Sequence, residues 1–254
     1  MNQINETIKH QLAHRTIREY KDEEIPEEIF QTLIEVARRT ATSTGMQASS
    51  IIRVTDPHIK KQVAEVCNQE YVARAPELLI FIVDQHRNWN IAKEKDCFEE
   101  SIRTMDQFFA SFTDACIAAQ NVVNAAESLG LGTVYLGSIL NDPERICEIL
   151  KLPELTFPAL GLGLGYPNQD PQLKPRMDMK YRVFENEYVS FDSYLDELKN
   201  YDEEMNTYYD LRMANRRVDT FTDQVVKRLM SPLPKRQKIL NAIRKQGFIF
   251  MLEE

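Results

Sequence analysis

Residues 108–140 combine a long apolar helical pattern with a short strand pattern. Ten apolar positions recur at helical spacing up to Leu129, and small side chains fill many of the places between them. This spacing predicts a helix buried in the core. Gly130 and Gly132 then predict the end of the helix, and the β-branched and aromatic residues 133–136 predict a buried strand.

This predicted strand ends at Gly137 and Ser138, where the backbone can approach a ligand closely. Asp142 can cap a further helix, and Pro143 suits its first position. The pattern therefore predicts a buried helix, a strand and a second helix around one exposed glycine turn.

The rest of the chain alternates helical and strand patterns. Helical spacing predicts helices at residues 5–13, 26–39, 56–68, 201–209, 220–229 and 233–245. Apolar and β-branched runs predict strands at residues 50–55, 78–83 and 158–166. The run at 78–83 is continuously apolar, which is typical of a strand covered on both faces. Residues 86–96 and 167–182 show neither pattern, and we expect surface loops there.

Length and composition indicate a soluble globular protein, with 254 residues, 43% hydrophobic and 28% charged. We expect a core at residues 1–182 and a helical appendage at residues 183–254. The longest apolar run is too short to cross a bilayer, and residues 1–10 are polar, unlike a signal peptide. We therefore expect a cytoplasmic protein with no membrane partner.

The net charge of −8 argues against a nucleic-acid partner, which normally needs a basic face. An anionic ligand would then require a local basic cluster. The four cysteines have no C-x-x-C spacing and lie in or beside apolar helical segments, so we expect reduced, mostly buried thiols. His10 and His14 have the spacing of two metal ligands on a helix, but no carboxylate motif completes a site. We expect no metal.

Three glycines, Gly161, Gly163 and Gly165, alternate with leucine but do not form a dinucleotide-binding motif. That motif requires a helix after the glycines, and here Pro167 leads into a loop. Residues 40–50 are more informative, because they are rich in hydroxyl groups and poor in apolar surface, which is typical of a loop that lines a ligand site.

Two basic pairs could hold one phosphate. Arg15 and Arg18 project to one side if the local turn is helical. Lys174 and Arg176 are two apart in a chain that Pro175 keeps extended, so their side chains share a face. For each pair alone, scattered surface cations are the favoured interpretation. Together with the hydroxyl-rich loop and the glycine turn, the pairs favour a phosphate-bearing cofactor.

A third basic cluster contains Arg212, Arg216 and Arg217 in the appendage. Arginines of this kind suit a second, exchangeable phosphate. They are also typical of a helix end whose cations complement the helix dipole. The residues alone leave both interpretations open.

With these segments placed, the chain resembles the flavin-dependent nitroreductases, specifically the group of NADPH-dependent flavin reductases and major oxygen-insensitive nitroreductases. The resemblance covers essentially the whole chain and rests on the order and spacing of five segments. These are residues 14–18 (HRTIR), 47–52 (QASSII), 125–132 (AAESLGLG), 173–176 (LKPR) and 208–217.

The resemblance implies an α+β sandwich whose central, mostly antiparallel mixed sheet is covered by helices, with a C-terminal helical excursion. It also implies a homodimer with FMN at the interface and NADPH as cosubstrate. The appendage would contribute to NADPH binding and to dimer contacts.

The same resemblance implies roles for individual residues. The phosphate and ribityl region of FMN would contact Arg15, Arg18, Lys174 and Arg176, with His14 and Thr16 beside them. The isoalloxazine ring would be surrounded by Thr42, Ser43, Gln69, Tyr135, Gly137 and Ser138. The 2′-phosphate of NADPH would meet Arg212 and Arg217. The sequence departs from the family pattern at Thr16, where serine is common, at Gly45 and Met46, and at Ser138, where glycine is frequent.

In such an enzyme the flavin carries the hydride chemistry, so we expect no catalytic protein residue. We expect two-electron transfer from NADPH to small-molecule acceptors, namely nitro compounds, flavins or quinones, by a ping-pong mechanism. One alternative is a flavin or quinone reductase with incidental nitro activity. Another is a flavin-binding protein without turnover.

Overall fold

The computed structural model describes residues 4–210, 216–217 and 219–250. It divides into two compact units, the first formed by Met1–Gln169 and Leu233–Glu254 and the second by Asp170–Pro232. These units differ from the two domains expected from the sequence, because the chain from Leu233 onward belongs to the first unit. The roles expected of residues 183–254 in NADPH binding and dimer contacts stay predictions.

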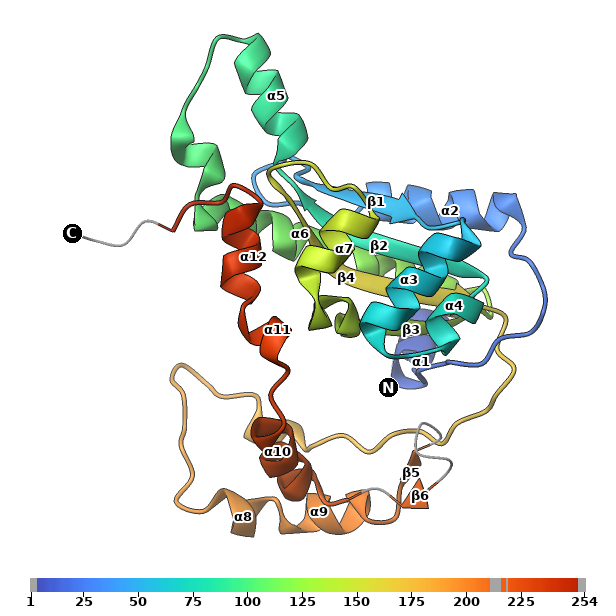
Figure 1. The fold of residues 1–254 in the computed structure, drawn as a ribbon. Coiled ribbons are helices and arrows are strands. Elements are labelled where there is room, and N and C mark those ends of the chain that lie inside the picture. The colour runs from blue at the N-terminus through green and yellow to red at the C-terminus, as the bar shows by residue number, and fades with distance from the viewer. Residues whose placement is uncertain (1–3, 211–215, 218, 251–254) are drawn as a thin grey trace. The chain divides into compact units, whose positions relative to one another are not determined.

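A four-stranded sheet forms the middle of the first unit, in the order β1-β2-β4-β3 (Figure 1). Its strands are β1 (Ser49–Arg53), β2 (Glu77–Asp84), β3 (Gly132–Leu136) and β4 (Thr156–Gly165). All three ladders are antiparallel, and a parallel bridge joins Thr16 to Thr133. The expected α+β fold with a mostly antiparallel sheet is therefore confirmed.

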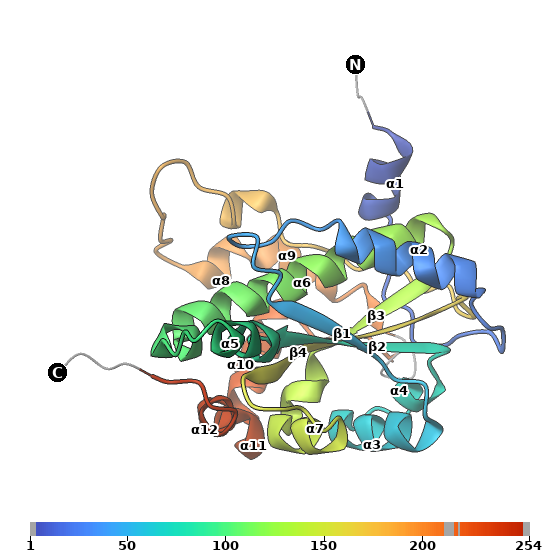
Figure 2. The same ribbon diagram turned by 90° about the horizontal axis from the view of Figure 1, so that it is seen from above.

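Helices cover both faces of this sheet (Figure 2). One face packs against α2 (Glu27–Arg38) and α6 (Met105–Ser128). The other face packs against α3 (Pro57–Cys67), α4 (Tyr71–Arg74) and α7 (Pro143–Ile149), joined by α12 (Ile239–Lys245). The strand β2 is buried at every position except its last, as expected for a strand between two helical layers.

The helix α6 is the longest element of this unit, with 24 residues. Its side facing the sheet carries small residues such as Ala115, Ala119 and Ala126, which are fully buried and let the helix lie close to the strands. The expected core helix is thus confirmed along one side. The opposite side is open, since Phe109 is 61% and Ile117 44% exposed.

Two helix starts follow the sequence signals. The side chain of Asp142 accepts a hydrogen bond from the Arg145 backbone N–H at 3.3 Å, and Pro143 takes the first turn of α7. Asp56 caps α3 in the same way, through the backbone N–H of His58 at 2.7 Å. These local signals were sufficient because a cap needs only residues within one turn.

Three expectations about local structure were wrong. Residues 86–96, expected to be a loop, contain α5 (His86–Glu94), in which Asn88 is buried and Trp89 packs on the core. The apolar stripe of α5 is too sparse to signal a helix. The helix expected at 201–209 is α9 (Lys199–Met205). The single helix expected at 233–245 is divided into α11 (Pro234–Gln237) and α12.

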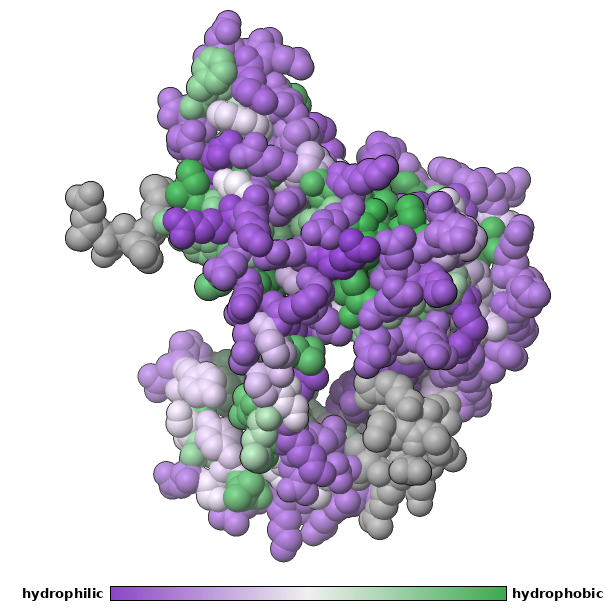
Figure 3. All heavy atoms as spheres, in the orientation of Figure 1, coloured by the Kyte–Doolittle hydropathy of each residue, from purple (hydrophilic) through white to green (hydrophobic). Residues whose placement is uncertain are grey.

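The remaining elements of the first unit are short. They are α1 (Glu6–Leu12) and the 3₁₀ turns η1 (Glu100–Arg103) and η2 (Gly137–Asn141). Among the residues that the structure describes, no helix has both the length and the apolar character to span a membrane. Hydrophilic residues cover most of the surface visible in Figure 3.

The second unit contains η3 (Met179–Tyr181), α8 (Tyr194–Glu197), α9, the two-residue strands β5 (Tyr209–Asp210) and β6 (Arg216–Arg217), and α10 (Phe221–Met230). Asp202 of α9 accepts a hydrogen bond from the Thr222 backbone N–H at 3.0 Å, and the rings of Tyr201 and Phe221 lie 5.3 Å apart. These contacts join α9 to α10.

Candidate functional site

Residues 14–18 follow α1 and run beside β3. The Ile17 backbone N–H donates to the Thr133 carbonyl at 2.8 Å. This approach depends on Gly132, because a Cβ atom at that position would lie only 2.5 Å from Ile17 Cγ1. The glycine therefore fixes the segment that carries His14, Arg15 and Arg18 against the sheet.

Both arginines of this segment have unsatisfied buried nitrogens. The Nε atoms of Arg15 and Arg18 are buried and have no hydrogen-bond partner within the described part of the chain. A buried N–H without an acceptor is unfavourable, and guanidinium groups bind phosphate oxygens strongly. The two side chains therefore fit an anionic, oxygen-rich ligand such as a phosphate.

The carboxylate of Glu127, near the end of α6, connects His14 to the sheet. Its Oε1 atom lies 2.7 Å from His14 Nδ1 and accepts a hydrogen bond from Thr133 Oγ1 at 2.8 Å. Thr133 is buried. Glu127 lies in residues 125–132, one of the five segments that carry the resemblance, but no role was predicted for it. A carboxylate at the end of an apolar helix was a usable signal for such a role.

The glycine turn forms a second part of the site. In η2, Ser138 Oγ donates to Gln69 Oε1 at 2.7 Å. Gln69 reaches this position because α3 ends at Asn68, which has the left-handed φ of 52°. At Gly137, an added Cβ would meet nothing within 4 Å, so the turn faces open space. The structure thus brings Gln69, Gly137 and Ser138 together, and their place beside a flavin ring stays a prediction.

Tyr135 occupies the one exposed position of β3. Its hydroxyl donates to Gln120 Oε1 of α6 at 3.1 Å. The partial burial of this side chain raises the pKa of Tyr135, and the hydroxyl is protonated at neutral pH and can donate a hydrogen bond.

The hydroxyl-rich loop lies between α2 and β1. Thr42 and Ser43 are exposed on it, and the Ser43 backbone N–H donates to Asp114 Oδ1 of α6 at 2.7 Å. Asp114 was not among the residues predicted from the sequence. The available signal was that Asp114 is an acidic residue among the apolar positions of α6, where a carboxylate needs a partner.

The other predicted site residues lie in the second unit or outside the described residues. Lys174 is partly buried and Arg176 exposed, on either side of Pro175, whose carbonyl accepts from Tyr201 Oη at 3.4 Å. Because both belong to the second unit, their approach to the first basic pair stays a prediction. Arg217 lies in β6, and Arg212 lies outside the described residues.

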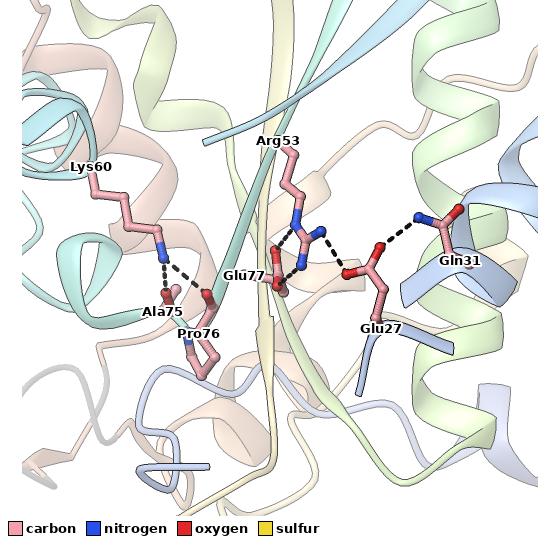
Figure 4. Close-up of polar contacts among 7 residues, drawn as sticks. All are labelled: Glu27, Gln31, Arg53, Lys60, Ala75, Pro76 and Glu77. Carbon is pink, nitrogen blue, oxygen red and sulfur yellow. Dashed lines mark hydrogen bonds and ion pairs between the residues drawn. The ribbon is translucent and has the colours of Figure 1, made fainter. Parts of the chain in front are cut away.

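A cavity of about 1020 Å³ in the first unit lies beside this site. Arg53, on its wall, contacts Glu77 Oε1 at 2.6 Å and Glu27 Oε2 at 3.0 Å (Figure 4). Among the described residues predicted for the cofactor site, Arg18 alone lines this cavity. Since Arg53 pairs with Glu77 and Glu27, we interpret these three charged groups as structural ion pairs.

The metal and thiol expectations concern the same unit. No cluster of three or more metal-binding side chains occurs among the described residues. All four cysteines are free: Cys67 and Cys147 are buried, Cys116 is partly buried and Cys97 is exposed. Burial raises the pKa of the Cys67 thiol to about 11, against a weaker opposing effect of its hydrogen bond with Ser138. This thiol is therefore protonated at neutral pH.

Comparisons with known proteins agree over nearly the whole chain. A model described as the nitroreductase family matches residues 12–166, and one described as the nitroreductase family C-terminal domain matches residues 174–251. The chain is 37% identical over 246 residues to an oxygen-insensitive NADPH nitroreductase of Salmonella typhimurium, and the matched region covers 96% of this chain and 99% of that protein. It is 34% identical to the FMN reductase (NADPH) of Bacillus subtilis, with 96% and 99% covered.

Two solved structures are also similar. The structure of B. megaterium NfrA1 matches with a TM-score of 0.88 and 36% identity, over 96% of this chain and 99% of that one. The NADPH:FMN oxidoreductase from Vibrio harveyi, complexed with NAD+, matches with a TM-score of 0.84 and 33% identity, over the same shares of 96% and 99%.

Proposed function

The chain belongs to the nitroreductase family, and on that premise we propose that it is an FMN-dependent enzyme that oxidises NADPH and reduces nitro compounds, flavins or quinones. Relatives named as an NADPH nitroreductase and as an NADPH-dependent FMN reductase support both the activity and the two cofactors. The observation that carries the assignment here is the pair of buried, unpartnered Nε atoms of Arg15 and Arg18.

The residues of the first unit have the chemistry that FMN requires. Arg15 and Arg18 would hold the phosphate, with His14 oriented by Glu127 and with Thr16 beside it. Lys174 and Arg176 would complete the phosphate site. The side facing the ring would be formed by Thr42, Ser43, Gln69, Tyr135, Gly137 and Ser138.

When bound, FMN supplies the hydride chemistry, and the protein supplies binding, orientation and polarity. NADPH and the electron acceptor would use the open space at Gly137 in turn, which predicts ping-pong kinetics. Arg212 and Arg217 would bind the 2′-phosphate that distinguishes NADPH from NADH. We place this activity in the cytoplasm.

We further propose a homodimer. The face of α6 turned away from the sheet exposes Phe109 and Ile117, two large apolar side chains of a kind that protein interfaces cover. A second copy of the chain is the expected occupant, and residues 183–254 would add to the contact. Sedimentation of an active monomer near 30 kDa at micromolar concentration would contradict this arrangement.

Flavin content and steady-state NADPH oxidation test the proposal. We expect the purified protein to carry FMN and to oxidise NADPH with free FMN, quinones and nitroaromatic compounds as acceptors. Replacing Arg15 and Arg18 by alanine should weaken FMN binding at least about tenfold for each residue, because each removes a charge-assisted hydrogen bond. Arg38→Ala removes an exposed arginine paired with Glu35 on α2 and should leave FMN binding unchanged.

The outcomes separate the candidate functions. Wild-type flavin content in the Arg15→Ala, Arg18→Ala variant would refute the cofactor site. A yellow protein that fails to oxidise NADPH, whichever acceptor is supplied, would support the flavin-binding alternative. Turnover confined to free flavin or quinone would support a reductase with incidental nitro activity, an alternative that the FMN reductase among the relatives favours.

A further inference from the structure

The loop at residues 40–47 is exposed from residue 41 onward, yet its backbone has an unusual conformation. Thr44, Gly45 and Gln47 have φ values of +50°, +72° and +49°. Threonine and glutamine rarely adopt this left-handed conformation, and such strain persists only where surrounding contacts hold it. The loop therefore needs anchors in the neighbouring elements.

Two helices of the first unit supply those anchors. From α6, Asp114 Oδ1 accepts the Ser43 backbone N–H at 2.7 Å, and Asn121 Nδ2 donates to Thr40 Oγ1 at 3.0 Å. From α5, Asn88 Nδ2 donates to the Met46 carbonyl at 3.2 Å. The loop is thus held at its start, its middle and its end.

The contact of Asp114 differs from the others in its burial. Asp114 is only 3% exposed, whereas Ser43, to which it binds, lies at the surface. A carboxylate in the interior of an apolar helix is unfavourable unless hydrogen bonds satisfy it. The contact with the loop gives this carboxylate its partner, and the loop gains a strong, charge-assisted anchor.

We propose that Asp114 is a positioning residue for the flavin site. Its carboxylate fixes the Ser43 backbone and thereby holds the hydroxyl groups of Thr42 and Ser43 where they form one wall of the ring pocket. This role rests on the proposed function, because the position of that wall beside the flavin comes from the proposed FMN site. Asp114 itself touches neither cofactor nor substrate.

Hydrogen exchange tests the anchor without any flavin. In the FMN-free wild-type protein, the Ser43 amide should exchange slowly for a residue on an exposed loop. Asp114→Leu keeps the branching at Cγ in a bulkier, apolar side chain and removes the acceptor, and we expect this amide to exchange about 10- to 100-fold faster. Asp114→Asn keeps an acceptor oxygen and should restore slow exchange. If the leucine variant does not fold, Asp114→Ala gives the same comparison with less steric change.

Kinetics and flavin spectroscopy of the holoenzyme test the consequence. Asp114→Leu should keep a flavin content near that of the wild type, because the phosphate anchors at Arg15 and Arg18 remain. Its bound-flavin absorption band should shift, and kcat/KM for a nitroaromatic acceptor should fall about tenfold or more. Asp114→Asn should restore both quantities.

Ser111→Ala is the matched control. Ser111 is buried one turn before Asp114 on α6, but its hydroxyl accepts from Gln85 Nε2 at 2.7 Å instead of holding the loop. This variant should lose stability through the broken hydrogen bond while keeping wild-type Ser43 exchange, flavin spectrum and kcat/KM.

The results distinguish this inference from the proposed function. A Ser43 amide that exchanges rapidly in the wild-type protein would overturn the anchor. Unchanged kcat/KM and flavin spectrum in a folded Asp114→Leu holoenzyme would overturn the positioning role and leave the proposed function intact. A wild-type protein that binds no FMN would refute the proposed function, and the positioning role with it, even if the Ser43 amide is protected.

Discussion

Gly132 joins the core of the sheet to the segment that carries the first basic pair. An added Cβ at this position would lie 2.5 Å from Ile17 Cγ1, 2.6 Å from Ile17 Cβ and 2.8 Å from Ile17 Cγ2. A different rotamer of Ile17 cannot relieve this clash, because Ile17 Cβ is itself too close. In Gly132→Ala, the backbone of residues 14–18 must therefore move away from β3.

The expected cost has two parts. Overpacking of a core site typically costs about 1–3 kcal/mol. Loss of the 2.8 Å hydrogen bond from the Ile17 N–H to the Thr133 carbonyl removes roughly a further 1 kcal/mol. We expect the free energy of unfolding to fall by about 2–4 kcal/mol and Tm by roughly 5–15 °C. Because Arg15 and Arg18 move with the segment, FMN affinity should fall by about tenfold or more.

Thermal unfolding of the FMN-free protein and titration with FMN measure the two effects separately. Gly247→Ala is the matched control, since Gly247 has a φ of +88° and its added Cβ would lie 2.6 Å from Glu154 Oε1. The control should lose stability and keep FMN affinity. Adding Ile17→Ala to Gly132→Ala should not restore either quantity, because Ile17 Cβ remains.

Two results would refute this reasoning about Gly132. If Gly132→Ala keeps the wild-type Tm and FMN affinity, residues 14–18 do not depend on the close approach to β3. If Gly247→Ala lowers FMN affinity to the same extent, the loss reflects general destabilisation of the fold instead of displacement of the basic pair.

Two further predictions concern buried titratable groups. Glu77 is 8% exposed, and its carboxylate lies 2.6 Å from the Arg53 guanidinium (Figure 4). Glu77→Gln should lower the free energy of unfolding, measured in urea, by about 1–2 kcal/mol, a value reduced by the partial exposure of Arg53. An unchanged urea midpoint would contradict this. Burial raises the pKa of the Cys67 thiol from 9.0 to about 11 in the folded protein. The stabilisation that comes from this difference in pKa is therefore fully present below pH 9. As the pH rises from 9 to 11, the unfolded thiol loses its proton first and stability should fall by up to about 2–3 kcal/mol, a decline that Cys67→Ala should reduce.

Sequence patterns were sufficient where the information is local. The long apolar spacing of α6, the continuous apolar run of β2 and the cap at Asp142 each depend on neighbouring residues alone. The helix α5 could not be predicted in this way. It is stabilised by tertiary contacts, namely the burial of Asn88 and the packing of Trp89 on the core.

The candidate site was predicted less completely, because its geometry depends on how distant segments meet. The resemblance implied that Gln69 and Ser138 are neighbours of one ligand, and this stays a prediction; the structure joins the two side chains by a 2.7 Å hydrogen bond. Neither the sequence nor the resemblance could indicate that Gly132 is required by Ile17, since this contact joins positions more than a hundred residues apart. This contact follows from the way residues 14–18 align with β3.

Four of the polar residues that sequence reasoning missed lie on one helix. On α6, Asp114 and Asn121 hold the hydroxyl-rich loop, Gln120 binds the hydroxyl of Tyr135, and Glu127 binds the ring of His14. The pairs 114 and 121, and 120 and 127, are each seven residues apart, so each pair lies on one side of the helix two turns apart. Asp114 is buried, Asn121 and Glu127 are partly buried and Gln120 is exposed, and burying a polar side chain is unfavourable without partners. At Asp114, Asn121 and Glu127, the contacts of α6 with the loop, with β3 and with residues 14–18 offset the cost of burying polar groups, which is the pattern expected where a core helix also positions a binding site.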